Sequence, residues 1–191
     1  MLVAGVRILR GARIDLVDPF PEEYLDRAFQ WTKAYAGISL HDDNPADAES
    51  FKLSISARYR ASTYGVRLHG QDEPVGMVSF EPATARNAYL HIVLSRAVWG
   101  KGIGDDAIAL AIRHAFETDL DLTRVSVYML ERNRAAQALA RRIGFQVEGL
   151  FPDMVLQQGI PRGVLHFGLT RREWEKKTQV LCDQEETSND S

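Results

Sequence analysis

The sequence has a single cysteine, Cys182, among 191 residues. One cysteine excludes an internal disulfide and any metal site built from several cysteines. Apolar runs are short, and none approaches the roughly 18 residues that a membrane-spanning helix needs. The first residues do not form a signal-like segment either. We therefore expect a cytoplasmic protein with no membrane partner.

An excess of positive charge is also lacking. Lys and Arg number 23 against 26 Asp and Glu, which gives a formal net charge of −3. A basic surface is typical of nucleic-acid-binding proteins, so we expect no nucleic-acid partner. The hydrophobic content of 45% is enough for one domain with its own core. We assign residues 1–176 to that domain and expect the polar residues 177–191 to be a disordered tail.

Three glycines at alternate positions, Gly100, Gly102 and Gly104, stand out. An apolar segment of strand length, residues 88–94, precedes them, and apolar residues at helical spacing follow. A strand-to-helix turn of this kind presents free backbone N–H groups at the positive end of a helix, which favours a phosphate or pyrophosphate. A tight turn without a ligand is the alternative. Neither the dinucleotide-binding G-x-G-x-x-G spacing nor a Walker loop fits these residues.

A second motif lies further along the chain. The expected strand 124–130 leads to Asn133, an alanine-rich helix and then Gly144-Phe145. Together the two motifs resemble the signature of the GNAT superfamily of acyl-CoA-dependent N-acetyltransferases, with its pyrophosphate loop and its later N-x-x-A/S helix. The segment Trp-Gly-Lys-Gly-Ile-Gly is most similar to the corresponding segment in the branch that contains the ribosomal-protein N-terminal acetyltransferases. The resemblance runs from about Val6 to Trp174.

The resemblance implies an α/β (α+β) fold with a mixed, mostly antiparallel twisted sheet of about six to seven strands. A central parallel pair is splayed, and about four helices flank the sheet. The residue pattern predicts one strand or a hairpin around Gly11 from segments 7–9 and 13–17, strands at 64–68, 75–80, 88–94, 124–130, 145–150 and 164–169, and helices at 22–36, 45–60, 101–117 and 133–143. By the resemblance, the first two helices border the acceptor, and the linker 39–43 could touch it; a solvated acidic loop is the alternative for the linker.

The resemblance also implies how acetyl-CoA is held. Backbone groups of Ile92, Val93 and Leu94 would pair with the pantetheine amides, and one N–H would polarise the thioester carbonyl. The pyrophosphate would be surrounded by Trp99, Gly100, Lys101, Gly102, Ile103 and Gly104. Asn133 would donate to the pantetheine or thioester region, or act as a helix N-cap, or both. Candidates for the 3′-phosphate are Arg96, Arg132 and Arg134, although they could equally be surface charge. Asp105 and Asp106 should point away from the phosphates.

The resemblance implies direct attack of an amine on the thioester, but two customary positions differ. Ala140 occupies the position at which many family members have a tyrosine that protonates the leaving thiolate. Tyr89 occupies the position at which many have a glutamate on the strand before the glycine turn. His91 and Glu81 are the candidate general bases, and Tyr128 is a possible proton donor. Without the glutamate, an α-amine or another amine of low pKa is favoured over lysine.

The resulting prediction is an acetyl-CoA-dependent N-acetyltransferase that needs no metal and acts on a protein N-terminus or a small amine. A CoA-binding sensory or regulatory module without transfer is the alternative, and a structural domain without a ligand is the third possibility. Trp174 and Val180-Leu181 could mark a homodimer contact.

Overall fold

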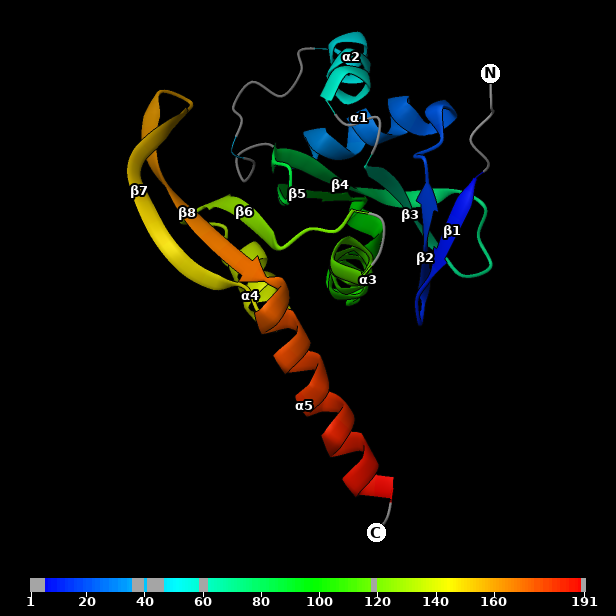
Figure 1. The fold of residues 1–191 in the computed structure, drawn as a ribbon. Helices are drawn as coiled ribbons and strands as arrows, with labels where there is room; N and C mark the ends of the chain where they lie inside the picture. The colour runs from blue at the N-terminus through cyan, green and yellow to red at the C-terminus, as the bar shows by residue number, and fades with distance from the viewer. Residues whose placement is uncertain (1–5, 36–39, 41–46, 59–61, 118–119, 190–191) are drawn as a thin grey trace.

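The computed structural model describes residues 6–35, 40, 47–58, 62–117 and 120–189 (Figure 1). One eight-stranded sheet has the order β1-β2-β3-β4-β5-β6-β8-β7, and every neighbouring pair is antiparallel except β5 with β6. The strands are β1 Arg7–Arg10, β2 Ile14–Asp18, β3 Thr63–Leu68, β4 Pro74–Thr84, β5 Asn87–Leu94, β6 Arg124–Leu130, β7 Gln146–Gln157 and β8 Ile160–Thr170. The helices are α1 Leu25–Lys33, α2 Ala48–Arg58, α3 Ile103–Glu117, α4 Arg134–Ile143 and α5 Arg171–Asn189, with 3-10 turns η1 Glu22–Tyr24 and η2 Arg96–Val98.

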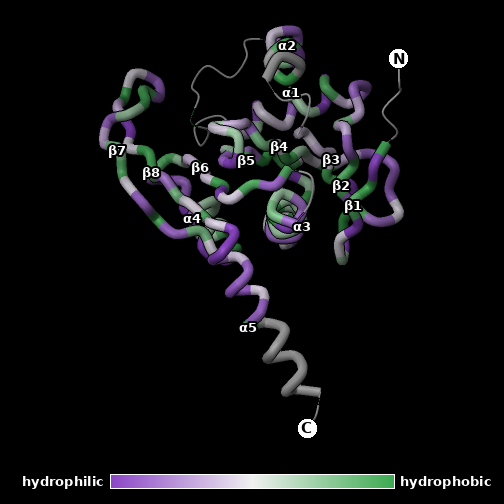
Figure 2. The backbone as a smooth tube through the Cα atoms, viewed as in Figure 1, coloured by the Kyte–Doolittle hydropathy of each residue, from purple (hydrophilic) through white to green (hydrophobic). Residues whose placement is uncertain are grey.

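Helices cover both faces of the sheet. α1 and α2 lie on one face, and α3 and α4 lie on the other (Figure 1). The larger core packs α3 residues such as Ile112 and Phe116 against the strands, while a smaller core packs α1 residues against Met77. Hydrophobic residues are concentrated in the strands and α3, whereas the described start of α5 is hydrophilic (Figure 2). Successive residues of a central strand therefore face different helix pairs.

The two motifs identified in the sequence lie at the N-termini of α3 and α4, and these two helices pack side by side. A Cβ added at Gly104 in the first turn of α3 would lie 3.2 Å from Leu139 Cδ2 of α4, so the absence of a side chain permits this close packing. α4 begins at an Asn133 cap whose Oδ1 accepts a hydrogen bond from the N–H of Ala136 (3.1 Å). It ends at Gly144, whose φ of 119° closes the helix.

The parallel pair β5–β6 is joined over a short length. Its register comprises Asn87 with Arg124, Ala88 with Val125 and Tyr89 with Ser126. Beyond that point β5 continues to pair with β4 as far as Leu94, and β6 continues to pair with β8 as far as Leu130. The splayed parallel pair expected from the sequence is therefore present.

The class of fold is confirmed, with eight strands in place of six to seven and five helices in place of four. Strand length is underestimated most at the C-terminal hairpin. There β7 and β8 extend to a tight turn with positive φ at Gln158 (52°) and Gly159 (75°). Most side chains of β7 are exposed, so no apolar alternation marked its full length. The linker 39–43 lies outside the described residues except for Leu40.

The end of the chain also differs from expectation. α5 continues to Asn189, so residues 177–189 are helical where a disordered tail was predicted. Trp174 is only 8% exposed and packs into the larger core, which anchors the start of the helix and leaves this indole unsuited to a dimer contact. The single domain 1–176 and the homodimer stay predictions.

None of the helices in the described part of the chain is long and apolar enough to cross a membrane.

Candidate active site

The glycine turn lies between β5 and α3. Gly100 (φ +71°) and Gly102 (φ +75°) adopt left-handed backbone conformations that favour glycine. A Cβ at Gly100 would meet no atom of the other described residues within 4 Å, so this side of the turn is open within the part of the chain that the structure describes. A Cβ at Gly102 would lie 2.8 Å from Nη2 of Arg13, which packs behind the turn.

The turn presents a row of unpartnered donors. Within the described residues, no backbone N–H of residues 100–105 donates a hydrogen bond to another backbone group. The next backbone donor after Trp99 is Asp106, whose N–H bonds to the Gly102 carbonyl (3.2 Å). The first N–H groups of a helix have no partner within the helix and carry its positive dipole end. Such a row, on a backbone that anions can approach closely, fits a diphosphate.

Arginines hold the two carboxylates beside the turn. Asp105 accepts two hydrogen bonds from Arg142 (2.7 and 3.1 Å), and Asp106 accepts one from Arg13 (2.6 Å). Arg13 also donates to the Lys101 carbonyl (3.2 Å) and so braces the turn. These pairings neutralise the acidic residues that would otherwise repel a phosphate.

The cations expected near a cofactor fall into two groups. Lys101 and Arg134 are exposed, at the turn and at the first position of α4. Arg96 and Arg132 contact protein groups instead: Arg96 donates to the Ala34 carbonyl (3.2 Å), and Arg132 donates to the amide oxygen of Gln157. Side chains of Lys101 and Arg134 are therefore the better placed of the four to meet an incoming anion.

The end of β5 carries its own side-chain partners. The Leu94 N–H donates to the Tyr35 hydroxyl (2.9 Å), and the Leu94 carbonyl accepts from that hydroxyl (3.2 Å) and from Trp99 Nε1 (3.0 Å). Alternate residues of a strand direct their backbone groups to the same edge. The edge of Leu94 is therefore shared by Ile92, whereas Val93 directs its groups toward β4. Burial raises the pKa of the Tyr35 phenol, and the hydrogen bond from Leu94 opposes that rise.

The two candidate bases contact each other. His91 Nε2 lies 3.2 Å from Glu81 Oε2, with side-chain exposures of 42% and 33%. His91 pairs with Ser79 in the β4–β5 register, and Val93, two residues further on, packs against the core under α1. The pair therefore lies on the face of the sheet that α1 and α2 cover, beside the diverging part of β5.

Aromatic rings line the same face across the parallel pair. The ring centroid of Tyr128 of β6 lies 5.3 Å from that of Tyr89. The same ring stacks on His166 of β8, with 4.6 Å between the centroids. Desolvation and the hydrogen bond with Tyr89 raise the pKa of the Tyr128 phenol. Ala140, the position at which many relatives have a tyrosine, is 4% exposed and has no proton to give. Tyr128, with Tyr89 beside it, is thus a phenol near the splayed pair.

His166 was not identified from the sequence. Its Nδ1 lies 3.4 Å from Glu148 Oε2, and its Nε2 is buried without a hydrogen-bond partner in the structure. Burial lowers the pKa of His166, while the Glu148 carboxylate acts in the opposite direction. A lone histidine on a strand gave no signal of this environment, because the partner comes from β7.

The lowered pKa of His166 predicts a pH-dependent stability. The unfolded chain binds this proton at a higher pH than the folded chain, so the contribution is fully present above about pH 6.5 and is lost as pH falls below it. We expect wild-type protein to lose more unfolding free energy between pH 7.5 and pH 5 than His166→Phe. Urea denaturation at the two pH values measures this, and an equal loss in both proteins would contradict it.

Asn133 acts as the N-cap of α4, which is the structural role foreseen for it. Beside it, Gln137 is 1% exposed and donates through Nε2 to the Glu131 carbonyl (2.7 Å). This bond fixes the loop that enters α4, at the end of the splayed strand β6. Its signal in the sequence was a lone amide among the alanines of a helix, four residues after the motif asparagine.

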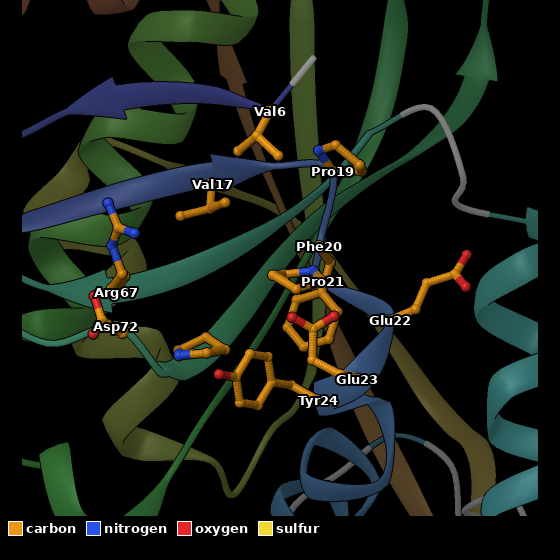
Figure 3. A pocket seen from close by; sticks show the side chains of 11 residues that line it. Val6, Val17, Pro19, Phe20, Pro21, Glu22, Glu23, Tyr24, Arg67 and Asp72 are labelled. Atoms are coloured by element: carbon orange, nitrogen blue, oxygen red, sulfur yellow. The ribbon is translucent and has the colours of Figure 1, made fainter. Parts of the chain in front are cut away.

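A separate pocket of about 550 Å³ lies beside η1 and strands β1 to β3, lined by Pro19, Phe20, Pro21 and Tyr24 among others (Figure 3). Its lining contains none of the residues predicted for the site. Arg67 on its wall is ion-paired with Asp15 (3.0 Å). The described residues contain no group of three or more metal-ligating side chains.

The glycine turn beside a splayed parallel pair is the arrangement expected from the sequence resemblance, and comparison with known families agrees. The model of the GNAT acetyltransferase domain matches residues 8–146, which is well over half of the chain. The protein belongs to the GNAT acetyltransferase family and is an acyltransferase. The family predicted from the two sequence motifs is therefore confirmed.

Particular relatives support the predicted branch. YdaF of Bacillus subtilis, provisionally named a ribosomal N-acetyltransferase, is 29% identical over 140 residues, 70% of this chain and 76% of its own. An uncharacterized N-acetyltransferase, p20 of Bacillus licheniformis, is 29% identical over 122 residues, 63% and 68% of the two chains.

Solved structures share the fold. A GNAT-family acetyltransferase from Bacillus anthracis has a TM-score of 0.75 at 15% identity and covers 87% of this chain and 100% of its own. RimL, described as a ribosomal L7/L12 alpha-N-protein acetyltransferase in complex with coenzyme A, has a TM-score of 0.73 at 18% identity and covers 86% and 98%.

Proposed function

We propose that the protein is an acetyl-CoA-dependent N-acetyltransferase that acetylates a primary amine by direct attack on the thioester. The observation that carries this proposal is the row of N–H groups at residues 100–105 that find no partner among the described residues, beside the diverging strands β5 and β6. When bound, acetyl-CoA supplies an acyl group activated as a thioester. Residues of the protein must bind acetyl-CoA and transfer the protons.

Binding is assigned to main-chain groups at two places. The N–H groups of the glycine turn bind the diphosphate, with Lys101 and Arg134 adding exposed positive charge. The edge of β5 that β6 leaves unpaired bonds to amides of the pantetheine arm, as in strand addition. Ile92 and Leu94 face that edge, and the N–H of Ile92 is the donor we assign to the thioester carbonyl, where negative charge develops.

Proton transfer is assigned to polar groups on the face under α1. An attacking amine must be neutral, and the Glu81–His91 pair accepts its proton. When His91 donates Nε2–H to Glu81, Nδ1 carries the basic lone pair. Tyr128 is the proton donor we assign to the departing thiolate, since Ala140 has none to give.

The acceptor we propose is a protein N-terminus, with a small amine such as a polyamine or amino sugar as the second candidate. YdaF and RimL carry names that refer to ribosomal proteins, which favours the first. An α-amine with a pKa near 8 also needs less help to lose its proton than a lysine near 10.4.

CoA release measured with acetyl-CoA and a set of amines tests the function. We expect turnover with peptides that have a free N-terminus and none with the same peptides acetylated beforehand. Tight binding of CoA without turnover on any amine would support the non-catalytic CoA-binding module instead. A saturating ligand at 100 times its Kd stabilises a protein by about 2.7 kcal/mol, so an unchanged melting temperature would contradict both.

A further inference from the structure

The last residue of β5 has both backbone groups occupied by side chains from elsewhere in the chain. Its N–H donates to the Tyr35 hydroxyl at 2.9 Å, and its carbonyl accepts from that hydroxyl at 3.2 Å and from Trp99 Nε1 at 3.0 Å. Tyr35 follows the end of α1, and Trp99 opens the glycine turn. Leu94 is therefore satisfied although β6 does not pair with it.

The Tyr35 hydroxyl fills both backbone positions of Leu94 that strand addition would use. A chain that extends a sheet accepts from the N–H of an edge residue with one amide and donates to its carbonyl with another, because the C=O and N–H of a trans amide point to opposite sides. A phenolic hydroxyl has one proton and accepting lone pairs, so a single hydroxyl can do both. Tyr35 thus occupies, with one hydroxyl, the N–H and the carbonyl of Leu94 that the proposed function assigns to pantetheine amides.

We propose that Tyr35 is an internal competitor for the cofactor, which occupies the pantetheine position at Leu94 in the free protein and is displaced on binding. This inference rests on the proposed function. A carbonyl can accept two hydrogen bonds, but the single N–H of Leu94 serves one good acceptor at a time. The apparent affinity for coenzyme A is then the intrinsic affinity multiplied by the fraction of molecules in which Tyr35 has released Leu94.

Neighbouring contacts link this competition to the other end of the cofactor. The Tyr35 ring meets the Trp99 ring edge-on at 5.0 Å, and the Arg96 guanidinium lies 5.4 Å from the Trp99 ring centre. Arg96 also donates to the carbonyl of Ala34, the residue before Tyr35. Displacing Tyr35 therefore loosens the contacts that keep Arg96, a candidate for the 3′-phosphate, on the end of α1.

Replacing the hydroxyl tests the competition directly. We expect Tyr35→Phe to bind coenzyme A about threefold to tenfold more tightly than wild type in calorimetric titration, the factor that corresponds to one ordinary net hydrogen bond. The matched control is Tyr24→Phe, because Tyr24 is a half-buried tyrosine on η1 at a distance from the turn. Its affinity should equal that of wild type.

An unchanged or weaker affinity in Tyr35→Phe, with wild type still binding, would overturn the competition and leave the proposed function intact. Failure of every protein to bind coenzyme A would overturn both. The Tyr35 ring resonances of wild-type protein, labelled with ¹³C-tyrosine, give a readout that needs no variant. Saturating coenzyme A should move them toward those of an exposed phenol, and resonances that do not move would overturn displacement.

Discussion

Replacing His91 by alanine should lower kcat/KM for acetyl transfer about 100-fold at pH 7 while leaving the Kd for coenzyme A unchanged. A positioned general base contributes on the order of 10²–10⁴-fold, and His91 with Glu81 is the base that we propose. Glu81→Gln should lose a comparable factor, because the carboxylate holds the ring through Nε2. The double variant should be no slower than His91→Ala, since residues that act as a unit are not additive.

The pH profile distinguishes a base from a structural pair. Without the base, only amine that is already neutral reacts, so the rate of His91→Ala should keep rising with pH toward the pKa of the acceptor. Stability should change by about 0–1 kcal/mol, because the pair is partly exposed. His69→Ala is the matched control: His69 Nε2 also contacts a carboxylate, Asp15 Oδ1 at 3.3 Å, at the other end of the sheet. A loss below threefold in His91→Ala would contradict the assignment.

The local part of the site could be predicted from the sequence because its signals are local. Alternate glycines after an apolar strand specify a turn with free donors, and Asn133 before an alanine-rich helix specifies a cap. Both features are present in the structure. The splayed pair followed from family resemblance, since no residue pattern states where two parallel strands stop pairing.

The contacts that could not be predicted are long-range in sequence. Tyr35 and Leu94 are 59 residues apart, and Arg13 and Asp106 are 93 apart. The three-dimensional fold brings each pair together, so neither residue of a pair signals its partner. The same holds for the length of β7, whose exposed side chains lack the one-sided apolar pattern that marks a strand. Side-chain occupation of the β5 edge at Leu94 is thus visible only in the folded chain.

Replacing Gly100 by alanine should weaken coenzyme A binding about 10- to 100-fold. A methyl group there projects into the open side of the turn, where nothing of the protein lies within 4 Å and where the diphosphate must approach. Loss of one hydrogen bond to a charged group costs roughly 1.5–3 kcal/mol, and each 1.4 kcal/mol is about tenfold in affinity. Alanine at a φ of +71° also strains the backbone by about 1–2 kcal/mol.

Gly70→Ala separates the strain from the lost contact. Gly70 has a φ of +77° and nothing within 4 Å of an added Cβ, but it lies in the turn between β3 and β4. Both variants should lose similar unfolding free energy in urea, and only Gly100→Ala should lose affinity in calorimetry. With S-acetylpantetheine, which has no diphosphate, kcat/KM should be alike in wild type and Gly100→Ala. Equal affinity for coenzyme A in all three proteins would show that the turn does not bind the diphosphate, because strain alone acts on both glycines equally.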